Sequence, residues 1–440
     1  MQPAILILLV VSTWNVLATP LSQDSTYKII RSQEVTVTAL RQPEKALDVP
    51  LAVTIVPKHR FEYSRGFGLD EALSLVSGVL VQSRTGNQDV RVMIRGFGAR
   101  GAGERSNAGT SRGIRFYIDG IPETEPDGRT AFDLIDLSGA TSIEVVRSNA
   151  SALWGNASGG IVSINTIPDI EQPYISAQAY AGSFGFFKQS VRAGTPTDIG
   201  KVYISLNNTA FDGYRQQSRS ALSQCYLGIV SNISSKTRMN TFLTAASNNF
   251  QIPGPLTEQQ FANNPQQAQH DPTIYNPTYV QRNEHRFNRL GRIGTTFEHA
   301  FSNHTVLSAM AFLQSKYLQR SERNTFRDFH RYHTGGNLLL RHSMHLNDTL
   351  YANILAGSDI QYQDGAILFY NQANGQRGTR LQTNKREGAQ NLGAFAQAEC
   401  RIGTQVSITG GLRYDNITYF NDDFINPKIN ESRAFERLTP

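Results

Sequence analysis

From about residue 174 onward, the chain is built from long segments in which apolar and polar side chains alternate. In VYISLNNTAF, Val202, Ile204 and Leu206 would lie on one face of a strand, with Ser205 and Asn207 on the other. QVSITGGLRYD repeats the pattern near the C-terminus. A membrane β-barrel requires strands of about ten residues with one apolar face, because lipid contacts that face and water the other. The pattern therefore favours a mainly β fold with a transmembrane antiparallel barrel.

The number of these segments and the lengths of their connections give a second signal. We count about eleven strands, at 174–182, 186–194, 200–211, 221–232, 236–248, 286–300, 304–317, 330–344, 348–361, 391–401 and 404–417. The links that follow every second strand are short, whereas those after the third, fifth, seventh and ninth strands are longer. Outer-membrane barrels show this parity, with turns in the periplasm and loops outside. A secreted β-sandwich or propeller, the alternative, predicts no such parity.

An odd number of strands leaves the predicted sheet open, and its last strand ends on the side of the long loops. In lipid, an unclosed sheet leaves a row of backbone donors and acceptors unpaired. We therefore expect the 440 residues to be part of a longer chain.

The N-terminus reads as an export signal. AILILLVV is apolar but too short to span a bilayer, and VLA places small residues at the −3 and −1 positions of a signal-peptidase site. We predict a signal peptide over residues 1–18, although its start lacks lysine and arginine. No later run of 18 apolar residues occurs, so the exported chain is either soluble or a β-barrel.

Residues 46–168, which precede the barrel, have a different sequence pattern that mixes helical and strand segments. LDEALSLVSGV places Leu69, Ala72 and Leu73 at helical spacing and Gly78 where a helix would stop. Short strand patterns follow in VRVMI, GIRFYIDG, SIEVV and GGIVSIN. The region is predicted to be a compact α+β domain.

Three glycines in IRGFGARGAG, Gly96, Gly98 and Gly101, fit the G-x-G-x-x-G spacing of a dinucleotide-binding loop. Such a loop needs a strand before it and a helix opening within it. The strand is present, but GARGAGERSNAGTSRG is polar, rich in glycine and without helical periodicity. We interpret the match as accidental and expect no cofactor.

Several motifs make the chain resemble the TonB-dependent outer-membrane transporters. VRVMIRGFG resembles the V-x-I-R-G hallmark of their plug domain, RFYIDGIP its D-G turn, and ATSIEVVRSNASALWGNASGGIVSINT its closing stretch. Ser148 and Asn149 stand where Gly-Pro is usual, and Trp154 replaces a tyrosine. IPGPLTEQQF resembles a loop of the ferric-citrate-like branch, and LGAFAQAE with ITGGLRYD resembles a mid-barrel signature.

The resemblance implies an N-terminal α+β plug inside a barrel of 22 strands, of which this sequence would hold the first half. It divides the chain into a periplasmic segment over 19–45, a plug over 46–168 and barrel strands over 174–440. RLTP would then end in an extracellular loop.

The same resemblance implies a TonB box, the extended segment that the partner protein TonB captures. It would comprise Gln33, Glu34, Val35, Thr36, Val37, Thr38 and Ala39. The β-branched residues suit an extended, unpaired segment that adds as a strand to the edge of a partner's sheet. An ordinary edge strand of the plug is the alternative.

Three charged residues in otherwise apolar strands, Arg95, Glu144 and Arg147, need partners, because a buried unpaired charge is costly. In the family, such residues help to lock the plug to the barrel wall. Pairing within the plug is the alternative, and both roles are structural.

Substrate contacts are expected at the outward loops of the plug, 97–113 and 121–130, and at the long barrel loops 249–284 and 362–390. The candidate residues are Arg100, Arg105, Arg112, Arg115, Glu125, Asp127 and Arg129. The arginines of the first loop suit an anionic ligand, such as an iron chelate held by carboxylates. A merely solvated loop is the alternative for any one of them.

Enzymatic chemistry finds no support in the sequence. The patterns G-x-S-x-G, P-loop and H-E-x-x-H are absent, and His330 and His333 would lie on opposite faces of one strand. Cys225 and Cys400 have no metal-binding or redox spacing, and a disulfide between them is left open. A net charge of +6 is too diffuse for nucleic acid. We expect no catalytic residue and no bound metal.

The sequence thus predicts a monomeric receptor in the lipid of the outer membrane. It would import a scarce substrate, a ferric siderophore or ferric citrate, with energy supplied through TonB. A transporter that also signals through an extra N-terminal domain is rejected, because only about fourteen residues separate Ala18 from Gln33. A secreted or surface β-protein that binds glycans or a partner without transport is the alternative.

Overall fold

The computed structural model describes residues 36–37, 41, 44–45, 51–63, 68–83, 88–98, 112–322, 324–347, 349–373, 375–403 and 405–440. All of them belong to one compact unit, Thr36–Pro440. The predicted signal peptide lies outside the described residues. Within the described part, none of the helices has both the length and the hydropathy needed to cross a bilayer.

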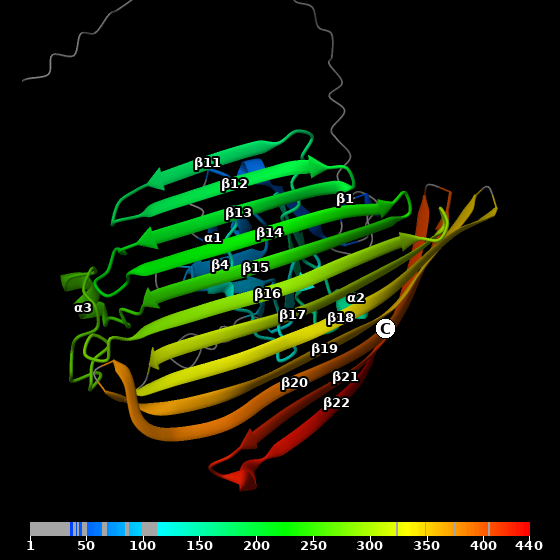
Figure 1. Cartoon of the computed structure of the whole chain (residues 1–440). Helices are drawn as coiled ribbons and strands as arrows, with labels where there is room; N and C mark the ends of the chain where they lie inside the picture. The colour runs from blue at the N-terminus through cyan, green and yellow to red at the C-terminus, as the bar shows by residue number, and fades with distance from the viewer. Residues whose placement is uncertain are drawn as a thin grey trace, which may run out of the picture. The chain divides into compact units, whose positions relative to one another are not determined.

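Twelve described strands form one antiparallel sheet, which we call the wall. Each strand pairs with the next along the chain, and Figure 1 shows them side by side in a curved sheet. They are β11 (Tyr174–Ala181), β12 (Phe187–Thr197), β13 (Gly200–Phe211), β14 (Ser220–Ser234), β15 (Thr237–Gln251), β16 (His285–Ala300), β17 (Thr305–Glu322), β18 (Thr325–Asn347), β19 (Leu350–Ala373), β20 (Gln376–Ile402), β21 (Val406–Asp423) and β22 (Glu431–Thr439).

The predicted alternation is confirmed along these strands. In β13, Ser205 and Asn207 are buried while Leu206 between them is exposed, and Ile293 and Leu313 are exposed on β16 and β17. Apolar side chains therefore point away from the enclosed side, and polar ones point into it. The short links 198–199, 235–236 and 301–304 mark what we call the turn end of the wall, and the link 252–284 marks the loop end.

Three details of the predicted strands are wrong. The wall has a twelfth strand, β22, so RLTP ends a paired strand rather than a loop. The predicted loop 362–390 is mostly strand, because β19 and β20 continue pairing almost to their connection. The links after the seventh and ninth strands are likewise short. At the loop end, β20 is polar on both faces and β19 carries the unbroken apolar run AILFY over 366–370, so neither strand shows alternation.

The elements from β3 to β10 form the plug. Its five-stranded sheet has the order β3 (Val53–Pro57), β9 (Ser142–Val146), β10 (Gly160–Asn165), β7 (Ile114–Ile118) and β8 (Ile121–Pro122). A three-stranded sheet holds β4 (Val79–Ser83), β5 (Val90–Ile94) and β6 (Phe97–Gly98). Before them, β1 (Thr36–Val37) pairs with β2 (Glu44–Lys45).

The described helices are short. The plug holds α1 (Leu69–Leu73), as its spacing predicted, and α2 (Ser151–Trp154), with the 3-10 turns η1 (Lys58–Arg60) and η3 (Phe132–Leu134). The wall's connections hold α3 (Glu258–Asn263) and the 3-10 turn η4 (Pro427–Ile429). The plug core is built from strands that are buried on both faces: every residue of β7 is buried.

Two glycines of the G-x-G-x-x-G match form a tight turn. Gly96 and Gly98 have φ of 87° and 126°, and a side chain on Gly98 would collide with the backbone of Val92 and Met93. The chain folds back after β5 into β6 and opens no helix there. The motif serves a hairpin, and Gly101 lies outside the described residues.

Candidate functional site

A short plug segment after β8 carries a set of buried ion pairs to the wall. Glu123 accepts a hydrogen bond from Arg292 of β16. Glu125 accepts one from Lys316 Nζ and one from Arg331 Nη1, each at 3.0 Å. All five side chains are at most 7 % exposed. Each charge therefore depends on its partner, because none of them can turn to water.

The next two charged residues of the same segment lie nearer to solvent. Asp127 accepts a hydrogen bond from Gln363 Nε2 at 3.2 Å and lies 3.7 Å from Arg331. Arg129 lies 3.4 Å from Asp127 and 3.9 Å from Glu387, and its side chain is 40 % exposed. The segment thus runs from buried pairs to a cation that a ligand can reach.

Burial alone would raise the pKa of Glu125. The adjacent cations Lys316 and Arg331 outweigh burial and lower the pKa to about 2. The carboxylate therefore stays charged wherever the plug is folded against the wall.

This lowered pKa predicts how acid affects the plug. A carboxyl whose pKa is lower in the folded state contributes its full stability above its ordinary pKa of 4.5. The contribution declines below that value and is lost as pH falls to about 2. We expect the protease resistance of the plug to be level above about pH 5 and to fall between pH 4.5 and 2. A Glu125→Gln variant that loses resistance over the same range would contradict this assignment.

A second plug–wall contact lies nearer the loop end. Asn288 Nδ2 donates to the Asp133 carboxylate, and Asn248 Nδ2 donates to the Asp133 carbonyl at 2.6 Å. Burial raises the pKa of Asp133, and the neighbouring Asp89 carboxylate raises it further. Arg286 Nη1 lies 3.1 Å from Asp89 and offsets that repulsion. This part of the plug is held by hydrogen bonds and one ion pair together.

A third contact involves the turn between β7 and β8. Asp119 accepts hydrogen bonds from the Thr166 backbone N–H at 2.8 Å, from the Thr166 hydroxyl at 2.7 Å and from the Tyr226 hydroxyl. Burial raises the pKa of Asp119 despite these donors. The turn is thereby tied both to the end of the plug sheet and to β14 of the wall.

Arg41, at the start of the described chain, is held at the turn end of the wall. Its guanidinium forms an ion pair with Asp359 at 2.8 Å and lies 4.1 Å above the Trp154 ring and 4.7 Å above the Phe395 ring. Arg413 shares Asp359 at 2.8 Å. Cation–π contacts of desolvated arginine contribute about 2 kcal/mol. The segment that carries the predicted TonB box is therefore anchored just after the box.

Only two residues of the predicted TonB box, Thr36 and Val37, are described; Gln33, Glu34, Val35, Thr38 and Ala39 lie outside the described residues. Thr36 pairs with Lys45 and Val37 with Glu44. The pair is extended, as expected, but it is joined to a strand of its own chain rather than unpaired.

The arginines that were predicted to contact substrate differ in how exposed they are. Arg100 and Arg105 lie outside the described residues. Arg112 is exposed, and a side chain added at Gly128 would lie 3.7 Å from its Cγ, so the two outward loops meet. Arg115 is 2 % exposed and donates to the Gly155 carbonyl at 3.4 Å. Among the described candidate arginines, Arg112 is exposed and Arg129 partly exposed, while Arg115 is enclosed.

Two of the three charges predicted to be structural make side-chain contacts within the plug. Arg147 donates to the Ser77 carbonyl at 2.6 Å and to the Thr54 hydroxyl at 2.9 Å. Glu144 accepts from Asn165 Nδ2 at 2.8 Å. These contacts favour the alternative of pairing within the plug for Arg147 and Glu144. Arg95 is exposed, and its contact with the Gly78 carbonyl is made by the backbone N–H.

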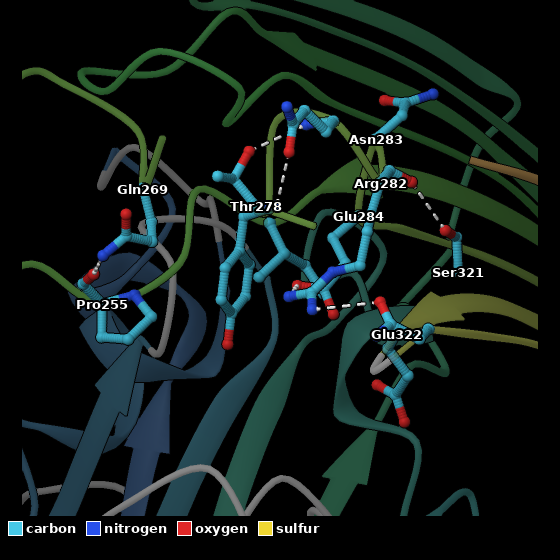
Figure 2. A network of polar contacts seen from close by, with 12 residues as sticks. Pro255, Gln269, Thr278, Arg282, Asn283, Glu284, Ser321 and Glu322 are labelled. Atoms are coloured by element: carbon cyan, nitrogen blue, oxygen red, sulfur yellow. Dashed lines mark hydrogen bonds and ion pairs between the residues drawn. The ribbon is translucent and has the colours of Figure 1, made fainter. Parts of the chain in front are cut away.

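The predicted barrel loop over 249–284 is compactly folded (Figure 2). Arg282 forms an ion pair with Glu284 at 3.2 Å, and its carbonyl accepts from the Ser321 hydroxyl at 3.0 Å. Gln269 donates to the Pro255 carbonyl at 3.3 Å. The loop thus has a defined shape before any ligand arrives.

The positions of two histidines and of both cysteines can be compared with the expectations from the sequence. His333 is buried and His330 exposed, which confirms that they lie on opposite faces. Cys225 and Cys400 do not form a disulfide. The described residues include no cluster of three metal-binding side chains.

The wall residues of the plug–wall contacts described above were not predicted from the sequence. Arg292, Lys316 and Arg331 lie on the polar faces of strands that the alternation predicted correctly. Charged residues on those inward faces are the signal that could have found them.

Comparison with known proteins shows which families the plug and the wall are similar to. A family model described as TonB-dependent Receptor Plug Domain matches residues 45–161. A second model, TonB dependent receptor-like, beta-barrel, matches residues 230–440. In sequence, the chain is similar to the vitamin B12 transporter BtuB of Photobacterium profundum, with 28 % identity over 183 residues. That match covers 41 % of this chain and 28 % of the relative's length.

Solved structures share the fold. The unliganded ferric citrate transporter FecA superposes with a TM-score of 0.76 at 15 % identity, over 89 % of this chain and 59 % of that one. The siderophore receptor PiuA from Acinetobacter baumannii gives 0.70 at 13 % identity, over 92 % and 63 %. The chain therefore spans less than two thirds of the length of these proteins.

Proposed function

The chain belongs to the TonB-dependent receptor family, and we propose that it imports an anionic ferric chelate, a siderophore complex or ferric citrate, across the outer membrane. Proteins of this family are outer-membrane β-barrel receptors and not enzymes. Membership in the family argues against the alternative of a secreted β-protein without transport. With the loop end outward, substrate would meet Arg112 and Arg129, and TonB would bind at the turn end.

The observation that carries the choice of an anionic substrate is the position of these two arginines. Both are accessible at the outward side of the plug, and Arg129 ends the segment that is paired to the wall. A carboxylate-rich chelate offers acceptors that guanidinium groups bind in bidentate fashion. Contacts of Arg115, Glu125 and Asp127 with substrate would require their present pairs to open.

The proposed mechanism uses binding and strand pairing rather than covalent chemistry. Chelate binds between the plug and the outer loops. The TonB box then leaves its partner strand and adds to the sheet edge of TonB, which pulls on the plug. Arg41 lies between the box and the plug, so force applied to the box reaches Asp359 and Trp154 first. We propose that the receptor works as a monomer in the membrane.

A corrinoid is the second candidate, because the sequence relatives reported above are vitamin B12 transporters. The charge of the ligand distinguishes the two candidate substrates. Loss of two exposed arginines should weaken binding of an anionic chelate far more than binding of a neutral corrinoid.

We expect the double variant Arg112→Ala and Arg129→Ala to bind ferric citrate or an anionic siderophore at least about tenfold more weakly, since each lost charged hydrogen bond costs about 1.5–3 kcal/mol. Binding to purified receptor would be measured for a panel of ferric chelates and cyanocobalamin. Lys236→Ala, which removes an exposed cation from the turn end, is the matched control and should bind normally. If cyanocobalamin alone binds saturably, the substrate is a corrinoid rather than a ferric chelate.

A further inference from the structure

A cavity lies between the plug and the wall at the turn end. It has a volume of about 480 Å³ and is enclosed by β15 to β18 on one side and by β7, β10 and the Asp119 turn on the other. We call it the vestibule. Its wall side combines polar residues, among them Arg238, Asn240 and Thr296, with the apolar Phe242 and Met310. A mainly apolar lining with a few polar groups is typical of cavities that hold small ligands.

The lower part of the vestibule is open to solvent. Arg238 and Glu298, which stand beside the short links of the turn end, are both exposed. Towards the loop end, in contrast, the plug covers the inward-facing residues of β15 to β18. The residue above Thr296 on the inward face of β16 is Gly294, and the one above that is Arg292.

One plug element, β8, forms this cover. Ile121 packs so closely on Gly294 that a Cβ at position 294 would lie 2.9 Å from Ile121 Cγ1. Ile121 shares an apolar cluster with Phe242, Met310 and Phe312 of the wall. Directly beyond it, Glu123 binds Arg292. Ile121 and Glu123 therefore contact the wall directly above the vestibule, whose own lining includes Asp119 and Gly120 of the preceding turn.

The segment Ile121–Glu125 lies at the edge of the plug's main sheet. β8 pairs with β7 through Tyr117–Pro122 and Ile118–Ile121, and the backbone N–H groups of Glu123 and Thr124 donate to the Phe116 carbonyl at 2.8 and 3.4 Å. The central strand β10, by comparison, pairs over five residues with each of two neighbours. An edge segment that is bonded on one side only opens at a lower free energy than the strands between two neighbours.

The ion pairs of the segment need not be lost when it moves. Lys316 and Arg331 now hold the Glu125 carboxylate. A carboxylate of an arriving chelate can take its place, so that neither buried cation is left unpaired. The charged end of the segment thus faces the substrate loops, and its apolar end faces the vestibule.

We propose that Ile121–Glu125 is the transport gate, and that its displacement from the wall joins the outer binding loops to the vestibule. The rest of the plug sheet stays in place during passage. This inference rests on the proposed transport function and adds the route that the chelate takes, along β17 and β18, where Glu125 is paired, because the Asp133 contacts to β15 and β16 stay in place.

A disulfide across the gate tests the proposal. In a Cys225→Ser, Cys400→Ser background, Ile121→Cys with Gly294→Cys joins the gate to the wall, since a Cβ at position 294 would lie 2.9 Å from Ile121 Cγ1, whose place the introduced sulfur takes. The matched control joins the plug to β13 with Gly139→Cys and Ser205→Cys, where a Cβ on Gly139 would lie 3.5 Å from Ser205 Cβ. Uptake and surface binding of a labelled ferric chelate are measured before and after reduction.

The gate disulfide should abolish uptake and leave binding intact, reduction should restore uptake, and the control disulfide should leave uptake unchanged. Uptake through the closed gate disulfide would overturn the proposal. Loss of uptake with both disulfides would also overturn it, because the whole plug would then have to move. If the cysteine-free parent takes up no chelate, the proposed function fails instead.

A single substitution provides a second readout that does not depend on the disulfide. Ser308→Cys, again in the cysteine-free background, places a thiol in the vestibule. A membrane-impermeant thiol reagent applied to the outside should label it only during energised uptake, when the gate is open. Labelling that does not change with substrate and energy would contradict the gate.

Discussion

A proline at Val37 is expected to reduce TonB-dependent uptake to background while surface binding of the substrate stays unchanged. Proline removes the backbone N–H that a strand donates to its partner, so the box could no longer complete a sheet edge. Uptake and binding of labelled substrate would be compared in cells, with binding measured after de-energising the membrane. Val37→Thr, which keeps the branched side chain and the N–H, should transport normally.

The pairing of Val37 with Glu44 requires one more control. Glu44→Pro disrupts the same β1–β2 pair without altering the box. If its uptake is normal, the effect of Val37→Pro comes from the missing contact with TonB. Normal uptake by Val37→Pro would show that residues 33–39 are not the TonB box.

Glu125→Gln is expected to give the largest loss of plug stability, up to about 3–5 kcal/mol, because it removes the carboxylate that two buried cations share. Lys316 and Arg331 then keep only the more distant carboxylates of Glu123 at 3.9 Å and Asp127 at 3.7 Å. Lys316 is 2 % exposed and Arg331 7 %, so neither can recover its hydration without displacing the plug. Urea unfolding of the purified receptor, followed by proteolysis of the plug, would measure the change.

Asp127→Asn is the matched control for that variant. Asp127 is 16 % exposed and lies 3.4 and 3.7 Å from its two arginines, so its loss should cost about 1 kcal/mol or less. Equal destabilisation by the two variants would mean that the Lys316–Glu125–Arg331 contacts do not hold the plug.

Sequence alternation located the wall strands wherever one face meets lipid. It failed where that condition ends. The upper part of β20 and most of β22 are polar on both faces, and the upper part of β19 carries the unbroken apolar run over 366–370, so none of them alternates. The physical cause is that backbone hydrogen bonds hold a strand together whether or not its side chains alternate.

The site was harder to predict because its halves are far apart in the sequence. Glu123 and Arg292 are separated by 169 residues, and nothing local to either marks the other. Family motifs placed Glu125 and Arg129 in a substrate loop, but they could not show that Glu125 already has two partners. Trp154, which departs from the usual tyrosine, proves to be a platform for Arg41. That contact depends on packing that no spacing rule contains.

The length of β19 and β20 has a consequence at the cell surface. With 24 and 27 residues, these strands extend about 80–90 Å, and a tilt of about 40° leaves some 60–70 Å along the membrane normal. The apolar band accounts for only about 25 Å of that height. Their joined tips therefore stand up to roughly 40 Å clear of the lipid, and we expect antibodies to reach them on intact bacteria.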